Sequence, residues 1–142
     1  MAAAVFRLLP LAAMAAIASC TSVRFAPLSF ESLPWRVDAI NGEDTPMVDN
    51  YRMEFAKGRL TARFGCNHFG GSYRVQRNQL VVAQLAGTRM RCPDPTRDFE
   101  NRATAILRSP MQIGRNPKSG GTLLSNAAGS LELAPIVTGK RL

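Results

Sequence analysis

Cys66, Cys92 and His68, the single histidine of the chain, are the residues whose types are best suited to chemistry. Together with a water molecule they could form a zinc site, because zinc takes cysteine and histidine ligands. The Cys66–His68 spacing is nevertheless shorter than the usual gap between paired zinc ligands. A nucleophilic Cys66–His68 pair would also need a third group to orient the imidazole, and the sequence suggests none. We therefore expect His68 to be a polar turn residue, and we expect neither a metal nor any other cofactor.

The acidic residues do not form a convincing acid–base pair. Glu43 and Asp44 are adjacent in a stretch that also contains Asn and Gly, so in a loop their carboxylates would point apart. Solvated loop carboxylates are far more common than a positioned general acid and base. We therefore predict that the protein is not an enzyme.

The elements that must position these residues are mostly strands. Residues 60–64 and 72–76 alternate apolar and polar side chains, as a half-buried strand requires. Between them lies the sequence GCNHFGG, whose glycines and asparagine tolerate positive φ and favour a chain reversal. Similar patterns predict strands at residues 35–40, 51–55, 80–83, 111–113, 122–124 and 131–133.

One helix is expected after residue 92. Asp94 can cap its N-terminus, Pro95 suits the first helical position, and Pro110 ends it. An apolar face that would pack on the sheet recurs at helical spacing, at Phe99, Ala103, Ile106 and Leu107.

About eight short strands and one helix predict a mainly β (α+β) fold, a small antiparallel β-barrel or strongly curved sheet with the helix packed on it. The chain is 46% hydrophobic and 20% charged, which suits one globular domain. Bulky inward side chains would fill a small barrel, namely Trp35, Met53, Phe55, Phe64 and Tyr73. A small-ligand-binding or hydrolytic barrel that uses its lumen is therefore the weaker alternative.

Residues 1–19 are typical of a bacterial signal peptide, with Arg7 before an apolar run that is too short to span a membrane. Residues 17–20, Ile-Ala-Ser-Cys, resemble the lipobox of bacterial lipoproteins, which predicts lipid attachment at Cys20. The alternative is ordinary cleavage after Ala18, which would release a soluble protein starting at Ser19. We expect a lipidated N-terminus and tether at residues 20–33 and a folded domain at 34–142.

Lipidation would attach the protein to a membrane of the cell envelope. Thr21 after the lipidated cysteine resembles sorting to the outer membrane of Gram-negative bacteria, so we expect an outer-membrane lipoprotein that faces the periplasm. Nucleic acid is scarce there, and we expect no nucleic-acid partner despite the net charge of +8.

The arginines suggest a different partner, an envelope protein or an anionic envelope component. If Leu60 and Phe64 face inward, Arg63 faces outward by alternation, and Arg74 does so on the next strand. The candidate anion-binding residues are Arg63, Arg74, Arg77, Arg89 and Arg91. The alternative is a solvated surface that keeps the protein soluble.

Cys66 and Cys92 are predicted to form a disulfide. Lipidation of Cys20 would use the odd one of three cysteines, and the exported compartment is oxidising. The intervening residues hold a predicted hairpin at 72–83, which can bring its two flanks together. Two buried free thiols are the alternative.

The run GCNHFGGSY, followed by LAGTRMRC and a segment with Phe99, Glu100 and Leu107, resembles the META domain of HslJ-like bacterial proteins. The resemblance covers about residues 33–133 and implies a small barrel-like domain with one helix, often in secreted or lipid-anchored proteins and often associated with stress. It implies no established catalysis. The positions that it marks as fold-defining are Gly65, Cys66, Asn67, Phe69, Gly71, Tyr73, Thr88, Met90 and Cys92. We therefore expect a non-catalytic envelope lipoprotein that binds or stabilises an envelope component under stress.

Overall fold

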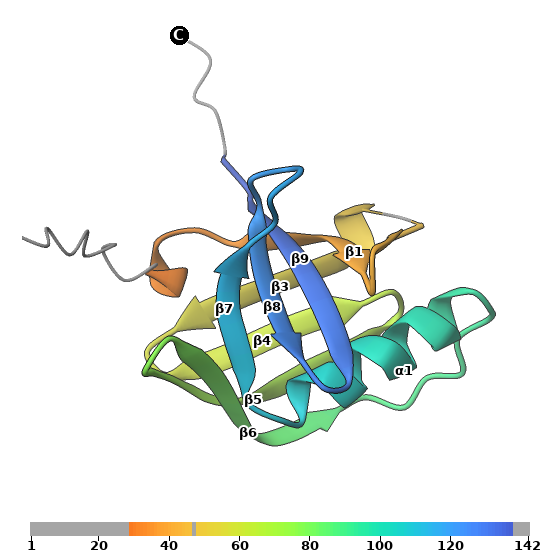
Figure 1. Ribbon diagram of the computed structural model, residues 1–142. Helices are drawn as coiled ribbons and strands as arrows, with labels where there is room; N and C mark the ends of the chain where they lie inside the picture. The colour runs from red at the N-terminus through yellow and green to blue at the C-terminus, as the bar shows by residue number, and fades with distance from the viewer. Residues whose placement is uncertain (1–28, 47, 138–142) are drawn as a thin grey trace, which may run out of the picture.

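The computed structural model describes residues 29–46 and 48–137 (Figure 1), so the predicted signal peptide and Cys20 lie outside the described residues. The strands are β1 (Trp35–Ile40), β2 (Glu43–Asp44), β3 (Tyr51–Ala56), β4 (Arg59–Phe64), β5 (Asn67–Gln76), β6 (Gln79–Gly87), β7 (Met111–Arg115), β8 (Thr122–Asn126) and β9 (Gly129–Pro135). The α-helix is α1 (Thr96–Leu107), and two 3-10 turns are η1 (Phe30–Ser32) and η2 (Val48–Asn50).

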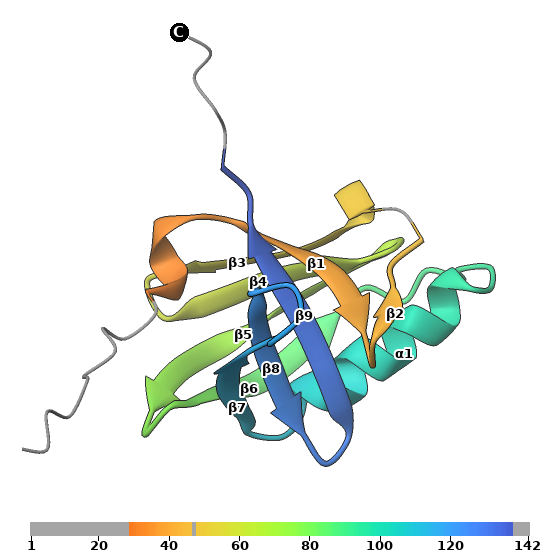
Figure 2. The same ribbon diagram turned by 45° about the horizontal axis from the view of Figure 1, so that its top comes forward.

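The strands form an antiparallel barrel. Their order is β2-β1-β3-β4-β5-β6-β7-β8-β9, and the additional pairing of β1 with β9 closes the sheet. Figure 2 shows β9 lying beside β1 at this closure. Because β2 is a two-residue addition to β1, the closed barrel has eight strands within the described residues. The predicted small antiparallel barrel with one helix is therefore confirmed.

The interior of the barrel is filled by side chains from alternate strand positions. Met53 and Phe55 on β3 and Phe64 on β4 are buried, as is Trp35 on β1, while the intervening positions face solvent or are half-buried. Tyr73 differs from the prediction, because it is only half-buried and its hydroxyl donates a hydrogen bond to Glu31 at 2.6 Å. The predicted filling of the interior is thus confirmed for four of the five side chains.

The GCNHFGG stretch is mostly strand, which corrects the prediction of a long turn. Phe64 pairs with Asn67, so only Gly65 and Cys66 lie in the turn between β4 and β5. The later glycines lie within β5, where its register with β6 shifts between Gly70 and Ser72. A Cβ at Gly71 would lie 2.8 Å from the carbonyl oxygen of Ala83. Gly71 therefore lets the backbones of β5 and β6 approach closely where their pairing is irregular. The sequence pattern alone does not distinguish this role of glycine from its role in a turn.

Helix α1 lies across one end of the barrel (Figure 1). Its predicted apolar face is confirmed, since Phe99, Ala103, Ile106 and Leu107 are all buried. The predicted N-terminus is wrong by one residue: Pro95 occupies the N-cap position, and Asp94 accepts a 2.6 Å hydrogen bond from Arg97 instead of capping the helix. In the described part of the chain, no helix is long and apolar enough to cross a membrane.

The folded domain begins before residue 34. Phe30 is only 2% exposed, and its ring centroid lies 5.5 Å from that of Trp35 and 4.9 Å from that of Phe55. The indole nitrogen of Trp35 donates a 3.1 Å hydrogen bond to the carbonyl oxygen of Phe30. Phe30, which lies within the tether predicted at residues 20–33, is therefore part of the core.

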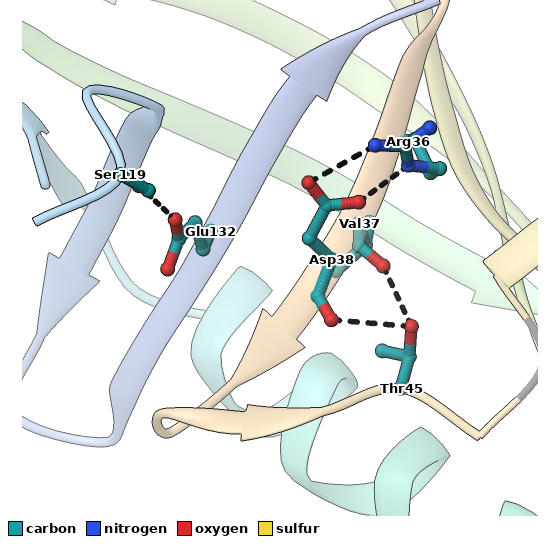
Figure 3. Close-up of polar contacts among 6 residues, drawn as sticks. All are labelled: Arg36, Val37, Asp38, Thr45, Ser119 and Glu132. Carbon is teal, nitrogen blue, oxygen red and sulfur yellow. Dashed lines mark hydrogen bonds and ion pairs between the residues drawn. The ribbon is translucent and has the colours of Figure 1, made fainter.

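Glu43 and Asp44 form the short strand β2, not the loop expected from sequence. Asp44 pairs with Ala39 of β1, and the next residue, Thr45, is buried with its hydroxyl donating to the carbonyl oxygen of Val37 at 2.9 Å (Figure 3). The Glu43 carboxylate accepts a 3.0 Å hydrogen bond from Arg102 of α1. These contacts connect the edge of the sheet to the helix.

Candidate functional site

The side chain of Asn67, at the start of β5, is the centre of a hydrogen-bond network between strand, loop and helix. It is 2% exposed, and its Oδ1 accepts 2.8 Å bonds from the Thr88 hydroxyl and from the Met90 backbone N–H. Its Nδ2 lies 3.1 Å from the Met90 carbonyl oxygen and 2.9 Å from each carboxylate oxygen of Glu100. Because an amide has two N–H donors, these acceptors share them. Asn67 thus holds the segment after β6 and helix α1 against β5.

The disulfide pair lies beside this network. Cys66 precedes Asn67 in the β4–β5 turn, and its Cα lies 6.2 Å from that of Cys92, with the two sulfurs at bonding distance. The predicted proximity of these cysteines is therefore confirmed, since the Cα atoms of a disulfide are usually 4.4–6.8 Å apart. The Nδ2 of Asn67 also lies 3.3 Å from Cys92 Sγ. The link between Cys66 and Cys92 and the Asn67 network therefore fix the same two segments.

A set of possible metal ligands lies here, but it differs from the set of Cys66, His68 and Cys92 considered from the sequence. Ligand atoms of Cys66, Cys92 and Glu100 all lie within 4.8 Å of one another. His68 is not among them, because it is the next residue along β5 after Asn67 and its side chain is exposed. In the disulfide the two sulfurs are bonded to each other, so neither is the thiolate that binds a metal.

A surface groove of about 530 Å³ runs beside the network. One wall is the end of β6 and the segment after it, and the other is the solvent-facing side of α1. The basic residues that line it are Arg89, Arg91, Arg97 and Arg108, and the acidic one is Glu100. Arg97 is partly neutralised by Asp94, at 2.6 Å, while the groove as a whole keeps an excess of positive charge.

The five candidate arginines are divided among three places. Arg63 faces outward from β4, where its Nε donates to the Gly65 carbonyl oxygen at 2.9 Å, and it lines a different depression that includes His68. Arg74 and Arg77 lie toward the β5–β6 turn, at the opposite end of that hairpin from Gly87. Of the five candidates, Arg89 and Arg91 line the groove.

Residues 28–135 match the META domain family, which is well over half of the chain. The chain belongs to the META domain family. It is similar to a protein solved by NMR, with a TM-score of 0.62 and 20% identity, covering 73% of this chain and 89% of that one. It is also similar to an NMR structure of a protein from Burkholderia xenovorans, with a TM-score of 0.59 and 18% identity, covering 78% and 85% of the two chains. No curated protein matches it significantly.

Several positions that the META resemblance marks as fold-defining lie in the Asn67 network. Asn67, Thr88, Met90 and Cys92 were marked as fold-defining, and the structure brings all four together. Glu100, in the second turn of α1, completes the network; it belongs to the segment that carries the resemblance but is not among the fold-defining positions.

Sequence reasoning missed Arg97 and Arg108 as groove residues. Both lie on or next to α1, on the side away from the apolar face of the helix. Their sequence signal is only that they are exposed helix positions, which most charged helix residues share. Their proximity to Arg89 and Arg91 depends on where the helix lies across the barrel.

Proposed function

We propose that this META domain protein is a lipid-anchored, non-catalytic envelope protein whose groove beside α1 binds an anionic envelope component. The observation that carries the proposal is the excess of arginine along the groove, where Arg89, Arg91 and Arg108 line it without an ion pair among the described residues. Positive charge concentrated in a concave surface attracts anions more strongly than the same charge spread over a sphere.

The walls of the groove are held rigidly, which favours binding. Arg89 and Arg91 flank Met90, whose backbone N–H and C=O groups both hydrogen-bond to the side chain of Asn67. Cys92, the next residue, is linked to Cys66. A surface that is ordered before binding loses less conformational entropy when the partner binds.

The absence of catalysis is part of the proposal and is supported by the surroundings of His68. Its ring is exposed on the outer face of β5, and no described side chain hydrogen-bonds to it. A histidine that acts as a general base is normally oriented by such a partner. The alternative, a ligand or hydrolytic site in the barrel lumen, has less support because buried side chains such as Phe64, Met53 and Leu124 fill the interior.

Membrane attachment and a role under envelope stress complete the proposal. They are supported by the lipobox-like residues 17–20 and by membership of the META domain family, since the resemblance to that family implies export or lipid anchoring. A groove on a tethered domain would meet anionic lipid, polymer or protein on the periplasmic side of the outer membrane.

Binding of the purified Cys20→Ala protein, which lacks the acyl chains, to polyglutamate and to phosphatidylglycerol vesicles tests the groove. We expect at least one probe to bind, with affinity falling as salt rises from 50 to 300 mM, because exposed charges are screened. The triple variant Arg89→Ala/Arg91→Ala/Arg108→Ala should bind at least tenfold more weakly. The double variant Arg74→Ala/Arg77→Ala is the control and should bind like the parent. Equal binding by both variants, or no salt-dependent binding by the parent, would exclude the groove as an anion site.

A further inference from the structure

One edge of strand β6 lacks a strand partner over most of its length. β6 pairs with β5 from Gln79 to Gly87, but with β7 only through Gln79 and Leu80. From residue 81 onward, no strand in the described residues pairs with the side of β6 that faces away from β5. Figure 1 shows β6 and β7 diverging there, with α1 crossing the opening. An unpaired edge can act as a template for an added strand.

The backbone that follows β6 continues this edge into the groove. The Thr88 N–H donates to the His68 carbonyl oxygen at 2.9 Å, and the Met90 N–H donates to Asn67 Oδ1 at 2.8 Å, so both residues are bonded on the β5 side. Neighbouring residues of an extended chain direct their backbone polar groups to opposite sides. Gly87 and Arg89 alternate with these two residues, and both line the groove at its strand wall.

The side chains of the groove select a particular kind of strand. Arg89 and Arg91 from the strand wall and Arg97 and Arg108 from the helix wall favour carboxylates. Met90 is 54% exposed at the same place, which is unusual for a large apolar residue and favours an apolar contact. An extended segment in which acidic and apolar residues alternate would place the two kinds of side chain on opposite faces.

The segments of this chain that lie outside the described residues do not match this chemistry. Residues 20–28 carry Arg24, residues 138–142 carry Lys140 and Arg141, and neither segment contains an aspartate or glutamate. Charge complementarity therefore favours a segment of another protein.

We propose that the free edge of β6 and the arginine groove together bind an extended acidic segment of a partner protein, which adds to the barrel as a strand. This inference rests on the proposed function and narrows its anionic partner to a peptide segment. The partner segment docks through backbone hydrogen bonds to the edge of β6. Its selectivity comes from ion pairs between its carboxylates and the arginines of the groove. The exposed Met90 contacts the apolar residues of the added strand.

The test uses a fluorescent peptide, Glu-Val-Glu-Val-Glu-Val-Glu, and the purified mature protein, with binding followed by anisotropy. Two further peptides carry N-methyl groups on all valines or on all glutamates, which removes the N–H donors along one strand edge or the other and leaves the charge unchanged. Strand addition uses one edge of the peptide only. We expect one N-methylated peptide to bind at least tenfold more weakly than the other, and the other to stay within threefold of the parent.

Equal binding by the two N-methylated peptides would overturn the strand addition, because charge alone would then account for the affinity. Binding to phosphatidylglycerol vesicles without binding to the parent peptide would also overturn it, and would leave the proposed anion site intact with lipid as its occupant. Failure of the peptide, polyglutamate and the vesicles to bind would overturn both proposals together.

Two charge-reversal variants test where on the protein the peptide binds. The double variant Arg89→Glu/Arg91→Glu should weaken binding of the parent peptide at least tenfold. The matched double variant Arg74→Glu/Arg77→Glu, on the same hairpin but at its other end, should leave affinity within twofold. Equal losses in the two variants would show that net charge, not the groove, governs binding. Circular dichroism of both variants verifies that the barrel is intact.

Discussion

The side-chain nitrogen of Asn67 lies 2.9 Å from each carboxylate oxygen of Glu100, which is 33 positions further along the chain. This contact joins the first residue of β5 to the middle of α1, and it lies beside the disulfide and at the edge of the groove. A buried amide with polar partners from three segments specifies one arrangement of those segments, since any other would leave its donors or acceptors unpaired.

Asn67→Ala should therefore destabilise the protein markedly. It removes the partner of the Met90 backbone and of the Glu100 carboxylate at a position where Asn67 is itself only 2% exposed, and leaving such groups unpaired costs about 1–3 kcal/mol each. We expect the free energy of unfolding, measured in urea, to fall by about 3 kcal/mol. Asn101→Ala, an exposed position on α1, is the control and should change it by about 0.5 kcal/mol or less. Similar effects of the two variants would show that the network contributes little.

Gly65→Ala tests the tight turn between β4 and β5. The φ of Gly65 is +70°, and a Cβ there would lie 2.1 Å from Thr96 Cγ2, so the variant combines backbone strain with a clash against the start of α1. Gly42→Ala is a matched control, because its φ is +78° and its Cβ would meet nothing within 4 Å. We expect a loss of about 1 kcal/mol for Gly42→Ala and at least about 2 kcal/mol more for Gly65→Ala, from thermal or urea unfolding. Equal losses would contradict the packing of Thr96 on the turn.

The Cys66–Cys92 disulfide should contribute substantially to stability. The cysteines are 26 residues apart, and closing a loop of that size lowers the entropy of the unfolded chain enough to stabilise the fold by roughly 3–4 kcal/mol. Titration of the unfolded, unreduced mature protein with a thiol reagent should find neither cysteine free, and prior reduction should expose both. Detection of two thiols without reductant would contradict the disulfide.

Tyr73 should ionise well above the range of an ordinary tyrosine. Burial, followed by the hydrogen bond that it donates to Glu31, raises the pKa of Tyr73 to about 12. Because the folded state holds this proton more tightly than the unfolded chain, with its pKa near 10, the stabilisation is complete below about pH 10 and is lost as the pH rises toward 12.

Absorbance at 295 nm during an alkaline titration checks the tyrosine prediction. The chain has two tyrosines, and burial also raises the pKa of Tyr51, so the native protein should show no step at the pKa of a free tyrosine. Tyr73→Phe should remove the step near pH 12 and leave that of Tyr51. A step at about pH 10 in the folded protein that disappears in Tyr73→Phe would contradict the hydrogen bond to Glu31.

Cys20 is predicted to carry the lipid anchor. Each buried methylene of an acyl chain contributes about 0.8 kcal/mol, so two or more chains on one residue hold a protein stably on a membrane. Mass spectrometry of the mature N-terminus should find an acylated Cys20, and Cys20→Ala should shift the protein from the membrane fraction. An unmodified N-terminus at Ser19 would exclude the anchor.

The sequence by itself determined most of the strands and their faces. In residues 51–64 the alternation of apolar and polar side chains predicts which of them are buried, because a strand has a local period of two and each residue's face follows from its neighbours. The apolar face of α1 follows from the helical period in the same way. The approach of Cys66 to Cys92 was also accessible, since a hairpin between them returns the chain to its starting point.

The tertiary structure decided the long-range contacts and the extent of the GCNHFGG turn. Glycine permits a turn, a register shift and a close approach alike, so only the pairing of β5 with β6 shows that Gly70 and Gly71 lie in a strand. The groove likewise depends on α1 crossing the barrel where β6 and β7 diverge, which brings Arg97 and Arg108 opposite Arg89 and Arg91. No local pattern encodes that crossing, because the position of a helix on a barrel is set by packing between segments that are distant in sequence.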